Sequence, residues 1–462
     1  MAAGWARAEM AGARLWDGRC RRSLVTISER LGQQPGASLS AACGAGLRHA
    51  AHRLFAHPQT TVVGLLAGHV AQTVERGGEH DLVLAVQDST EFDYSGHKQT
   101  SGLGPLGRGL TRGLMGHSVL AVSPDGLPLG LLHLVIWARD PAQLGKRCTR
   151  RKRGTAAKES QKWLDGLQAT EAALPANQPV VLVADREADV FAYLAAPRRP
   201  LTALLIRACY PRTVIVAAPT AAGGEKQTSL LEAARCAPVV GQRQVTVPRQ
   251  PGQREREATL ELRLTAAQVQ PPRNRPPGEA TTPVAVWIVC ATEVAPPVGE
   301  APIEWILVTT LAVPDGATAS RVVGYYTRRW VIERWHYTLK SGLRVERLQI
   351  EDATALQNAL AVYGVVAWRL LWLTHIARVA PETPAAELVE ASERTVLKQA
   401  SGSPVETARQ VVRAIARLGG FAGSPSEGEP GVKALWLGFR RLEAMVEGWR
   451  LAFQAMSTMI HD

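Results

Sequence analysis

Two short apolar runs, far apart in the sequence, each end at an aspartate. Leu82–Gln87 leads to Asp88, and Val180–Ala184 leads to Asp185. Runs of this length predict buried strands of an α/β sheet. Ligands and catalytic groups gather where the strands of such sheets end. An aspartate in this position also caps turns and following helices, and the pattern taken alone favours that capping role.

Further patterns extend the α/β region. Ser118–Ser123 and Leu129–Trp137 flank a Pro-Asp-Gly turn and predict a hairpin, Ala156–Ala173 predicts a helix, and Trp305–Thr310 predicts another strand. Between about residues 211 and 304, prolines and glycines cluster among alternating segments. Alternation of this kind is typical of strands, so we expect a β-rich insertion there.

Both ends of the chain predict helices. Residues 1–70 contain amphipathic, arginine-rich segments that suit either a solvated helical cap or a DNA-binding surface. Apolar residues between 432 and 453 recur on one side of a helix, which by default packs within the monomer and alternatively forms a dimer contact. We therefore expect three domains, with boundaries 1–70, 71–375 and 376–462.

Charge and cysteine usage narrow the class of protein. The net charge of +12 suggests a polyanionic partner such as nucleic acid, but an acidic membrane surface or a simple role in solubility fits the charge as well. The six cysteines form no CxxC pair, which argues against a zinc site and for a reducing compartment. We see no signal peptide, and the apolar stretch Leu356–Leu373 contains Arg369 and predicts a buried helix. A cytoplasmic protein without a membrane span is expected. The basic run Lys146–Arg153 suits either a phosphate-binding patch or a solvated loop.

A helix predicted over Ser320–Ser341, closed by Gly342, carries four functional side chains on one face. They are separated by three, four and seven positions: Tyr326, Arg329, Glu333 and Lys340. At this spacing all four fall within a sector of about 60°. Such a stripe suits a metal-bound phosphate, with the carboxylate on the ion and the cations on phosphate oxygens. The alternative is an exposed ion pair between Arg329 and Glu333, worth only tenths of a kcal/mol.

The stretch Tyr326–Glu333, followed by Lys340, fits the pattern Y-x2-R-x3-E-x6-K. In this it resembles the bacterial insertion-sequence transposases of the DDE group with a YREK motif. Further blocks resemble that family in the same order: Ala50–Phe55, Gln87–Thr90, Lys158–Leu164, Asp185–Leu194 and Ala414–Phe421. The likeness therefore spans nearly the whole chain.

The resemblance implies a fold and a reaction. The fold is α/β, a ribonuclease H-like catalytic core with a β-rich insertion and helical N-terminal and C-terminal domains. Asp88, Asp185 and Glu333 would hold Mg²⁺ or Mn²⁺, with two ions expected. The reaction is cut-and-paste DNA transposition: hydrolysis at the transposon end, hairpin formation and strand transfer. Its partners are double-stranded DNA, as transposon ends and target, and a second copy of the chain in a synaptic complex.

The resemblance also assigns DNA contacts. Tyr326, Arg329 and Lys340 match residues that hold a phosphate of the non-transferred strand. Trp305 matches a tryptophan that receives a flipped base, and Arg207 an arginine near the hairpin. The alternatives are a core tryptophan and a plain surface arginine.

Three departures from the family pattern bear on DNA contact. Cys209 stands where a lysine is expected, so one DNA contact is in doubt. Ser89 replaces a threonine with little expected effect. The N-terminal helices agree only in outline, so the recognised end sequence is not predicted. The rival functions are a non-cutting DNA-binding protein and a structure-specific nuclease on the same fold.

Overall fold

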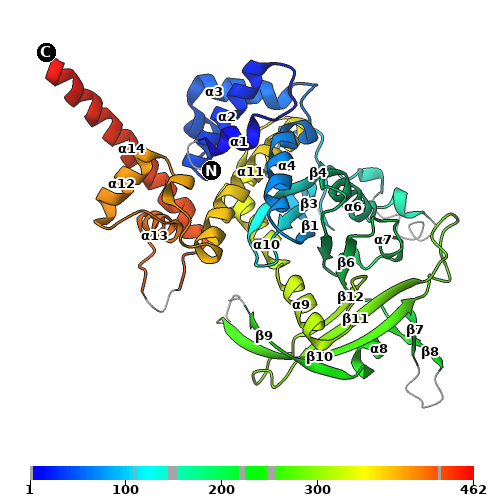
Figure 1. Cartoon of the computed structure of the whole chain (residues 1–462). Helices are drawn as coiled ribbons and strands as arrows, with labels where there is room; N and C mark the ends of the chain where they lie inside the picture. The colour runs from blue at the N-terminus through cyan, green and yellow to red at the C-terminus, as the bar shows by residue number, and fades with distance from the viewer. Residues whose placement is uncertain are drawn as a thin grey trace. The chain divides into compact units, whose positions relative to one another are not determined.

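The computed structural model shows how the chain divides. It describes residues 4–107, 111–143, 153–217, 224–247, 255–424 and 428–461. The chain packs into two compact units: unit 1 comprises residues 1–80, 89–143 and 331–462, and unit 2 comprises 81–88 and 144–330 (Figure 1). The basic run predicted at 146–153 lies outside the described residues except for Arg153. The expected domain boundaries remain predictions.

Unit 1 begins with four helices, as predicted for the N-terminal segment. They are α1 (Trp5–Met10), α2 (Gly18–Gln33), α3 (Leu39–Ala56) and α4 (Val62–Gly78). The last three begin at side chains that accept a backbone N–H: Asp17 from Arg19, Ser38 from Ala41 and Thr61 from Gly64. Gly68 lets α1 approach α4 closely, because a Cβ there would lie 2.6 Å from the carbonyl oxygen of Glu9.

A hairpin and a long helix form the centre of unit 1. Strands β3 (Arg112–Val122) and β4 (Pro128–Trp137) pair antiparallel, as predicted, and β2 (Gly104–Pro105) adds to β3. Helix α11 (Ala353–Val379) packs on β4, where the indole N–H of Trp368 donates to Pro128 O at 2.8 Å. Its most apolar window is long enough to span a membrane but is 94% buried within the protein. Helix α11 is therefore a helix of the protein core.

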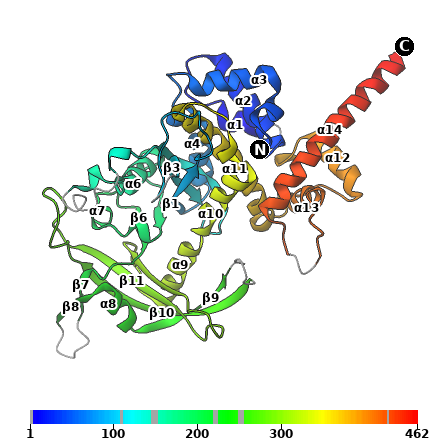
Figure 2. The same ribbon diagram turned by 180° about the vertical axis from the view of Figure 1, so that it is seen from behind.

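The C-terminal part of unit 1 is helical, with α12 (Ala391–Ser401), α13 (Ala408–Leu418) and α14 (Val432–His461) (Figure 2). The predicted apolar stripe on α14 divides into two parts. Leu435, Leu442 and Val446 are buried within the unit, whereas Phe453 is 60% exposed. Packing within the monomer explains the first part of the stripe but not the second.

Unit 2 is built on a mixed sheet. Its strands follow the order β1-β5-β6-β12-β11-β10-β7-β8, and β9 pairs with β10. Their bounds are β1 (Val83–Asp93), β5 (Val180–Ala184), β6 (Thr202–Arg207), β7 (Thr213–Ala217), β8 (Glu225–Ser229), β9 (Val239–Val247), β10 (Arg256–Val269), β11 (Val284–Glu293) and β12 (Glu304–Thr309). The segment predicted to be β-rich thus contains five strands, β7 to β11, among its described residues, with one helix, α8 (Leu230–Cys236).

Helices α6 (Gln161–Ala173), α7 (Phe191–Leu194) and α9 (Gly316–Thr327) also belong to unit 2. The helix expected over Ala156–Ala173 starts later, because Lys158 is extended (φ −122°, ψ 155°) after a short 3₁₀ turn. Strand β1 continues past Asp88 into unit 1, so the prediction that it ends at Asp88 is wrong. Polar residues continue that strand, which an apolar run could not reveal.

The single helix predicted over Ser320–Ser341 is also wrong. Helix α9 ends at Thr327, α10 runs from Trp330 to Tyr337, and a π-helical turn (Thr338–Gly342) follows. The backbone N–H groups of Arg328 and Arg329 donate to the carbonyls three residues earlier, which tightens and ends α9. Tyr326, Arg329, Glu333 and Lys340 therefore do not lie on one continuous helix.

A buried charged network holds the start of unit 1 in place. The Glu9 carboxylate accepts from His69 Nδ1 at 2.5 Å and from Arg76 Nη1 at 2.7 Å, and both Glu9 and His69 are fully buried. Leu131 N–H donates to His69 Nε2 at 2.9 Å, so the imidazole carries its proton on Nδ1. Burial alone would raise the pKa of Glu9, but His69 and Arg76 outweigh it and lower that pKa.

We predict that Glu9→Ala destabilises the protein by about 3–5 kcal/mol, because it removes the buried carboxylate that accepts from His69 and pairs with Arg76. A carboxyl whose folded-state pKa is lowered stabilises the fold above its unfolded pKa, here near 4.5, and loses that effect as the pH falls through the folded value. Urea unfolding measured across the acid range should therefore show a flatter pH dependence in the variant.

The matched control is Glu75→Ala, an exposed carboxylate on α4. Its removal should change the unfolding free energy by less than about 0.5 kcal/mol. Equal destabilisation by both substitutions would contradict a specific role for the buried network.

Candidate active site

The two predicted aspartates come together in unit 2. Strands β1 and β5 pair in parallel with Gln87 opposite Ala184, so Asp88 and Asp185 are the next residues on neighbouring strands. Adjacent strands lie about 4.8 Å apart. The backbone of Asp185 stays extended (φ −84°, ψ −173°) although β5 has ended. Both residues are half-buried, which leaves their carboxylates partly open to solvent.

Donors of three kinds surround the Asp185 carboxylate. The backbone N–H of Arg186 donates to Oδ1 at 2.6 Å and caps a short 3₁₀ helix. The Tyr326 hydroxyl donates to the same oxygen at 3.5 Å, and Arg329 Nη1 lies 3.9 Å from Oδ2. The capping role considered from the sequence is therefore real. It coexists with a phenol and a guanidinium that a turn cap does not require.

The Tyr326 ring is buried, with 2% of its surface exposed. Burial raises the pKa of its hydroxyl and the charge of Asp185 raises it further, while Arg329 and Arg207 oppose this. The hydroxyl consequently stays protonated at neutral pH and remains a hydrogen-bond donor. Arg207 therefore lies close to the Tyr326 hydroxyl.

Trp305 and Arg207 border the same region of unit 2. The Trp305 ring meets the Tyr326 ring edge-on, with 5.5 Å between centroids, and the indole is only half-buried on β12. Arg207, at the end of β6, donates from Nη2 to Glu304 O at 2.9 Å. A neighbouring hollow of about 340 Å³ is lined by Arg186, Arg207 and Arg235. This face of unit 2 therefore presents an accessible aromatic ring beside several cations.

Glu333 and Lys340 belong to unit 1, as residues of α10 and of the π-helical turn that follows it. Lys340 Nζ donates to Glu91 O at 2.8 Å and pairs with Glu346 at 3.2 Å. Six of the eight predicted residues therefore lie in unit 2 and two in unit 1. Within the described parts of the chain, no group of three His, Cys, Asp or Glu side chains could hold one metal ion.

Sequence reasoning missed the role of Asp189. Its carboxylate accepts from the backbone N–H groups of Cys209 and Tyr210, at 2.8 and 3.0 Å, and from Arg212 Nε at 2.6 Å. Asp189 is 4% exposed, and its hydrogen bonds join the segment after Asp185 to the turn after β6. The side chain of Cys209 is not needed for this, because its backbone makes the contact. The one sign of this role in the sequence was the family-like block Asp185–Leu194, which contains Asp189.

Comparison with known protein families gives three matches in sequence order. Residues 2–60 match the transposase DNA-binding family, residues 141–368 the transposase DDE domain, and residues 365–458 the transposase Tn5 dimerisation domain. The second match includes Asp185, Tyr326, Arg329, Glu333 and Lys340, whereas Asp88 lies before it. The chain thus carries a DNA-binding domain and a dimerisation domain on either side of a DDE domain. Together the three matches cover most of the chain and support a DDE transposase.

Proposed function

We propose that this transposase cuts its element out of DNA and pastes it into a target, acting on double-stranded DNA as a dimer in a synaptic complex. The observation that carries the proposal is the parallel pairing that sets Asp88 beside Asp185, with Tyr326 and Arg329 on the second carboxylate. A pair of hard oxygen ligands next to phosphate-binding side chains is suited to phosphodiester chemistry.

Asp88, Asp185 and Glu333 are the residues that would hold two Mg²⁺ or Mn²⁺ ions. The chemistry of the donors fits, because carboxylate oxygens suit these ions and two of the three lie on adjacent strand positions. When bound, the ions activate the attacking oxygen and stabilise the leaving oxygen. Glu333 completes the proposed set of three carboxylates.

The cations and the phenol have a role in binding the scissile strand. Arg329 and Tyr326 now direct their donors at Asp185. In the DNA complex they would turn to the phosphate of the non-transferred strand, joined by Lys340. The planar guanidinium of Arg329 suits two phosphate oxygens at once. Trp305 would take a base flipped out of the duplex, and stacking on its ring would offset much of the cost of extrusion. Arg207 would contact the DNA near the hairpin.

The proposed reaction has four phosphoryl transfers in sequence. Water attacks the phosphodiester at the transposon end and releases a 3′-hydroxyl. That hydroxyl attacks the opposite strand, closing a hairpin and freeing the flanking DNA. A second water reopens the hairpin, and the regenerated 3′-hydroxyl attacks target DNA. In each transfer one P–O bond forms as another breaks, and the leaving oxygen takes up a proton.

We assign end recognition to residues 1–70, catalysis to 71–375 with its insertion at 211–304, and dimerisation to 376–462, all acting in the cytoplasm. The exposed ring of Phe453 and its neighbours on α14 support the last assignment. A non-cutting DNA-binding protein would not need Asp88 beside Asp185. A nuclease that stops after hydrolysis would not need a partly accessible Trp305 beside Tyr326.

We predict that Asp88→Ala, Asp185→Ala and Glu333→Ala each abolish Mg²⁺-dependent cleavage of the transposon end while leaving end binding within about twofold. Removal of one carboxylate takes away ligands of the proposed ions, and a loss of at least about 1,000-fold is expected for a group acting at the chemical step. The substrate is a DNA duplex that carries a short inverted repeat, to be sought in the DNA flanking the reading frame, and the readout is strand cleavage on a denaturing gel.

Glu187→Ala is the matched control for these carboxylates. Glu187 lies two residues after Asp185, is 68% exposed and pairs with Lys162 at 3.0 Å. This variant should cut at a near-normal rate. Normal cutting and joining by any of the three alanine variants would remove that residue from the proposed metal site.

We predict that Trp305→Ala slows hairpin formation more than the first nick, by about tenfold or more, because only the hairpin needs the flipped base and stacking contributes roughly 1–3 kcal/mol. Time courses of nicked, hairpin and open ends measure the two rates separately.

Trp287→Ala controls for loss of a tryptophan from this sheet, since Trp287 is half-buried on the adjacent strand β11. It should leave the ratio of the two rates unchanged. Equal slowing of both steps by Trp305→Ala would count against base flipping.

A further inference from the structure

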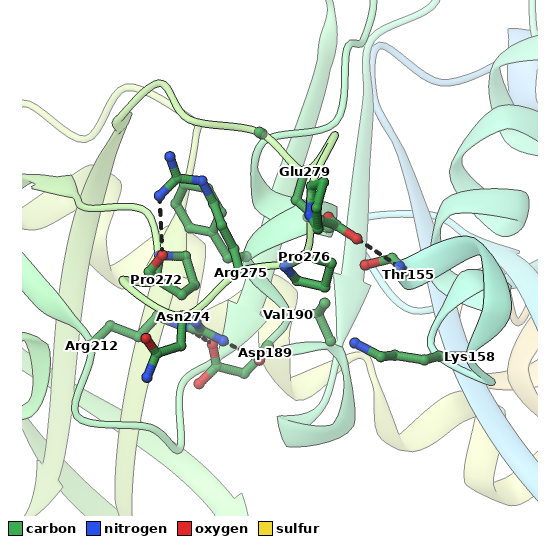
Figure 3. Close-up of a pocket in the computed structure, with 14 residues that line it drawn as sticks. Thr155, Lys158, Asp189, Val190, Arg212, Pro272, Asn274, Arg275, Pro276 and Glu279 are labelled. Atoms are coloured by element: carbon green, nitrogen blue, oxygen red, sulfur yellow. Dashed lines mark hydrogen bonds and ion pairs between the residues drawn. The ribbon is translucent and has the colours of Figure 1, made fainter. Parts of the chain in front are cut away.

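A second hollow in unit 2 lies apart from the residues assigned above. Its volume is about 880 Å³, and it lies beneath the proline-rich segment that joins β10 to β11 (Figure 3). Its walls come from three separate parts of the unit: the 3₁₀ turn at Thr155, the start of α7 at Phe191, and the proline-rich segment around Pro276. A hollow of this size is within the range of pockets that bind small ligands.

The two carboxylates of this pocket are already satisfied. Asp189 accepts from Arg212 and from two backbone N–H groups, as described above. Glu279 accepts from the backbone N–H of Thr155 at 2.6 Å, which fastens the proline-rich segment to the turn before α6 (Figure 3). Arg212 compensates the charge of Asp189, whereas Glu279 keeps its negative charge beside Thr155.

Among the described residues, two cations of the pocket have no carboxylate partner. Over the described residues, neither Lys158 nor Arg275 takes part in an ion pair. Arg275 donates from Nη1 to Pro272 O at 3.3 Å, which leaves other donors of its guanidinium for a ligand. Figure 3 shows Lys158 extending toward Val190, across the pocket from Pro272. The surplus charge of the lining is therefore positive.

The rest of the wall is apolar and rigid. The rings of Pro272 and Pro276 face the pocket with the side chain of Val190, and the amide of Asn274 lies beside them (Figure 3). Proline rings lose little entropy on binding because their backbone is already restrained. They offer a flat apolar surface to a sugar or a base, next to cations that suit a phosphate. The lining therefore matches a ligand with one anionic and one flat apolar part.

We propose that this pocket binds one nucleotide of an unpaired DNA strand. Lys158 and Arg275, on opposite sides of the pocket, hold the two phosphates that flank this nucleotide, and the prolines and Val190 cover its sugar and base. The base must be unstacked to reach the proline rings, which excludes intact duplex. The assignment of DNA as the ligand rests on the proposed function, because opening of the transposon end in that reaction leaves an unpaired strand. The site adds a contact to that strand beyond the residues around Asp185.

The test measures binding of a short, fluorescently labelled oligothymidylate to the full chain without divalent metal, by anisotropy. Lys158→Glu and Arg275→Glu should each weaken binding by about tenfold and reduce the salt dependence by roughly one phosphate contact. If charge reversal impairs folding, the milder variants Lys158→Gln and Arg275→Gln replace them. Each should also weaken binding, but by less than the corresponding Glu variant. Photocrosslinking through 5-iodouracil should label residues 272–280.

Arg273→Glu is the matched control, since Arg273 is exposed in the same segment but does not line the pocket. It should change affinity by less than about twofold. Equal weakening by Arg273→Glu, or no weakening by the Lys158 variants, would overturn the proposal. Displacement by thymidine monophosphate at comparable concentration would assign the pocket to a free nucleotide and overturn it too. If the wild-type chain bound oligothymidylate through this pocket but did not cleave transposon ends, the result would contradict the proposed function and not the pocket.

Discussion

The parallel pairing of β1 with β5 is the constraint on which the rest of the site depends. Hydrogen bonds between the two strands fix Gln87 opposite Ala184, and the chain must then deliver Asp88 and Asp185 to the same edge. Strand β5 and the paired part of β1, residues 83–87, are buried, and a one-residue slip would turn every side chain to the other face. Burial of these strand residues therefore offsets the repulsion between the two neighbouring carboxylates.

In unit 2, neighbouring donors compensate the negative charges of Asp185 and Asp189. Asp185 is met by a backbone N–H, by Tyr326 and by Arg329. Asp189 is met by two backbone N–H groups and Arg212. The second set is short and closed, as expected of a structural tie. The first is longer and looser, at 3.5 and 3.9 Å from the tyrosine and arginine, which suits donors that exchange a carboxylate for a phosphate.

Local patterns predicted the strands, the hairpin and the helical ends, because each depends on residues close in sequence. They failed at Arg328, where two i→i−3 hydrogen bonds end a helix whose periodicity continues. They also failed beyond Asp88, where polar residues prolong β1. The tie at Asp189 and the pocket around Lys158 join segments far apart in the chain, and no spacing rule reports such contacts. Family resemblance supplied the roles of the site residues, and the structure supplied the adjacency of Asp88 and Asp185.

The central claim is that Asp88, Asp185 and Glu333 share divalent ions when DNA is bound. A crystal structure of the transposase on its cleaved end, soaked in Mn²⁺ and recorded at the manganese absorption edge, tests it directly. The account predicts anomalous peaks about 2.0–2.3 Å from oxygens of all three carboxylates. Peaks held by the two aspartates alone, with Glu333 turned away from the metal in the DNA complex, would contradict it.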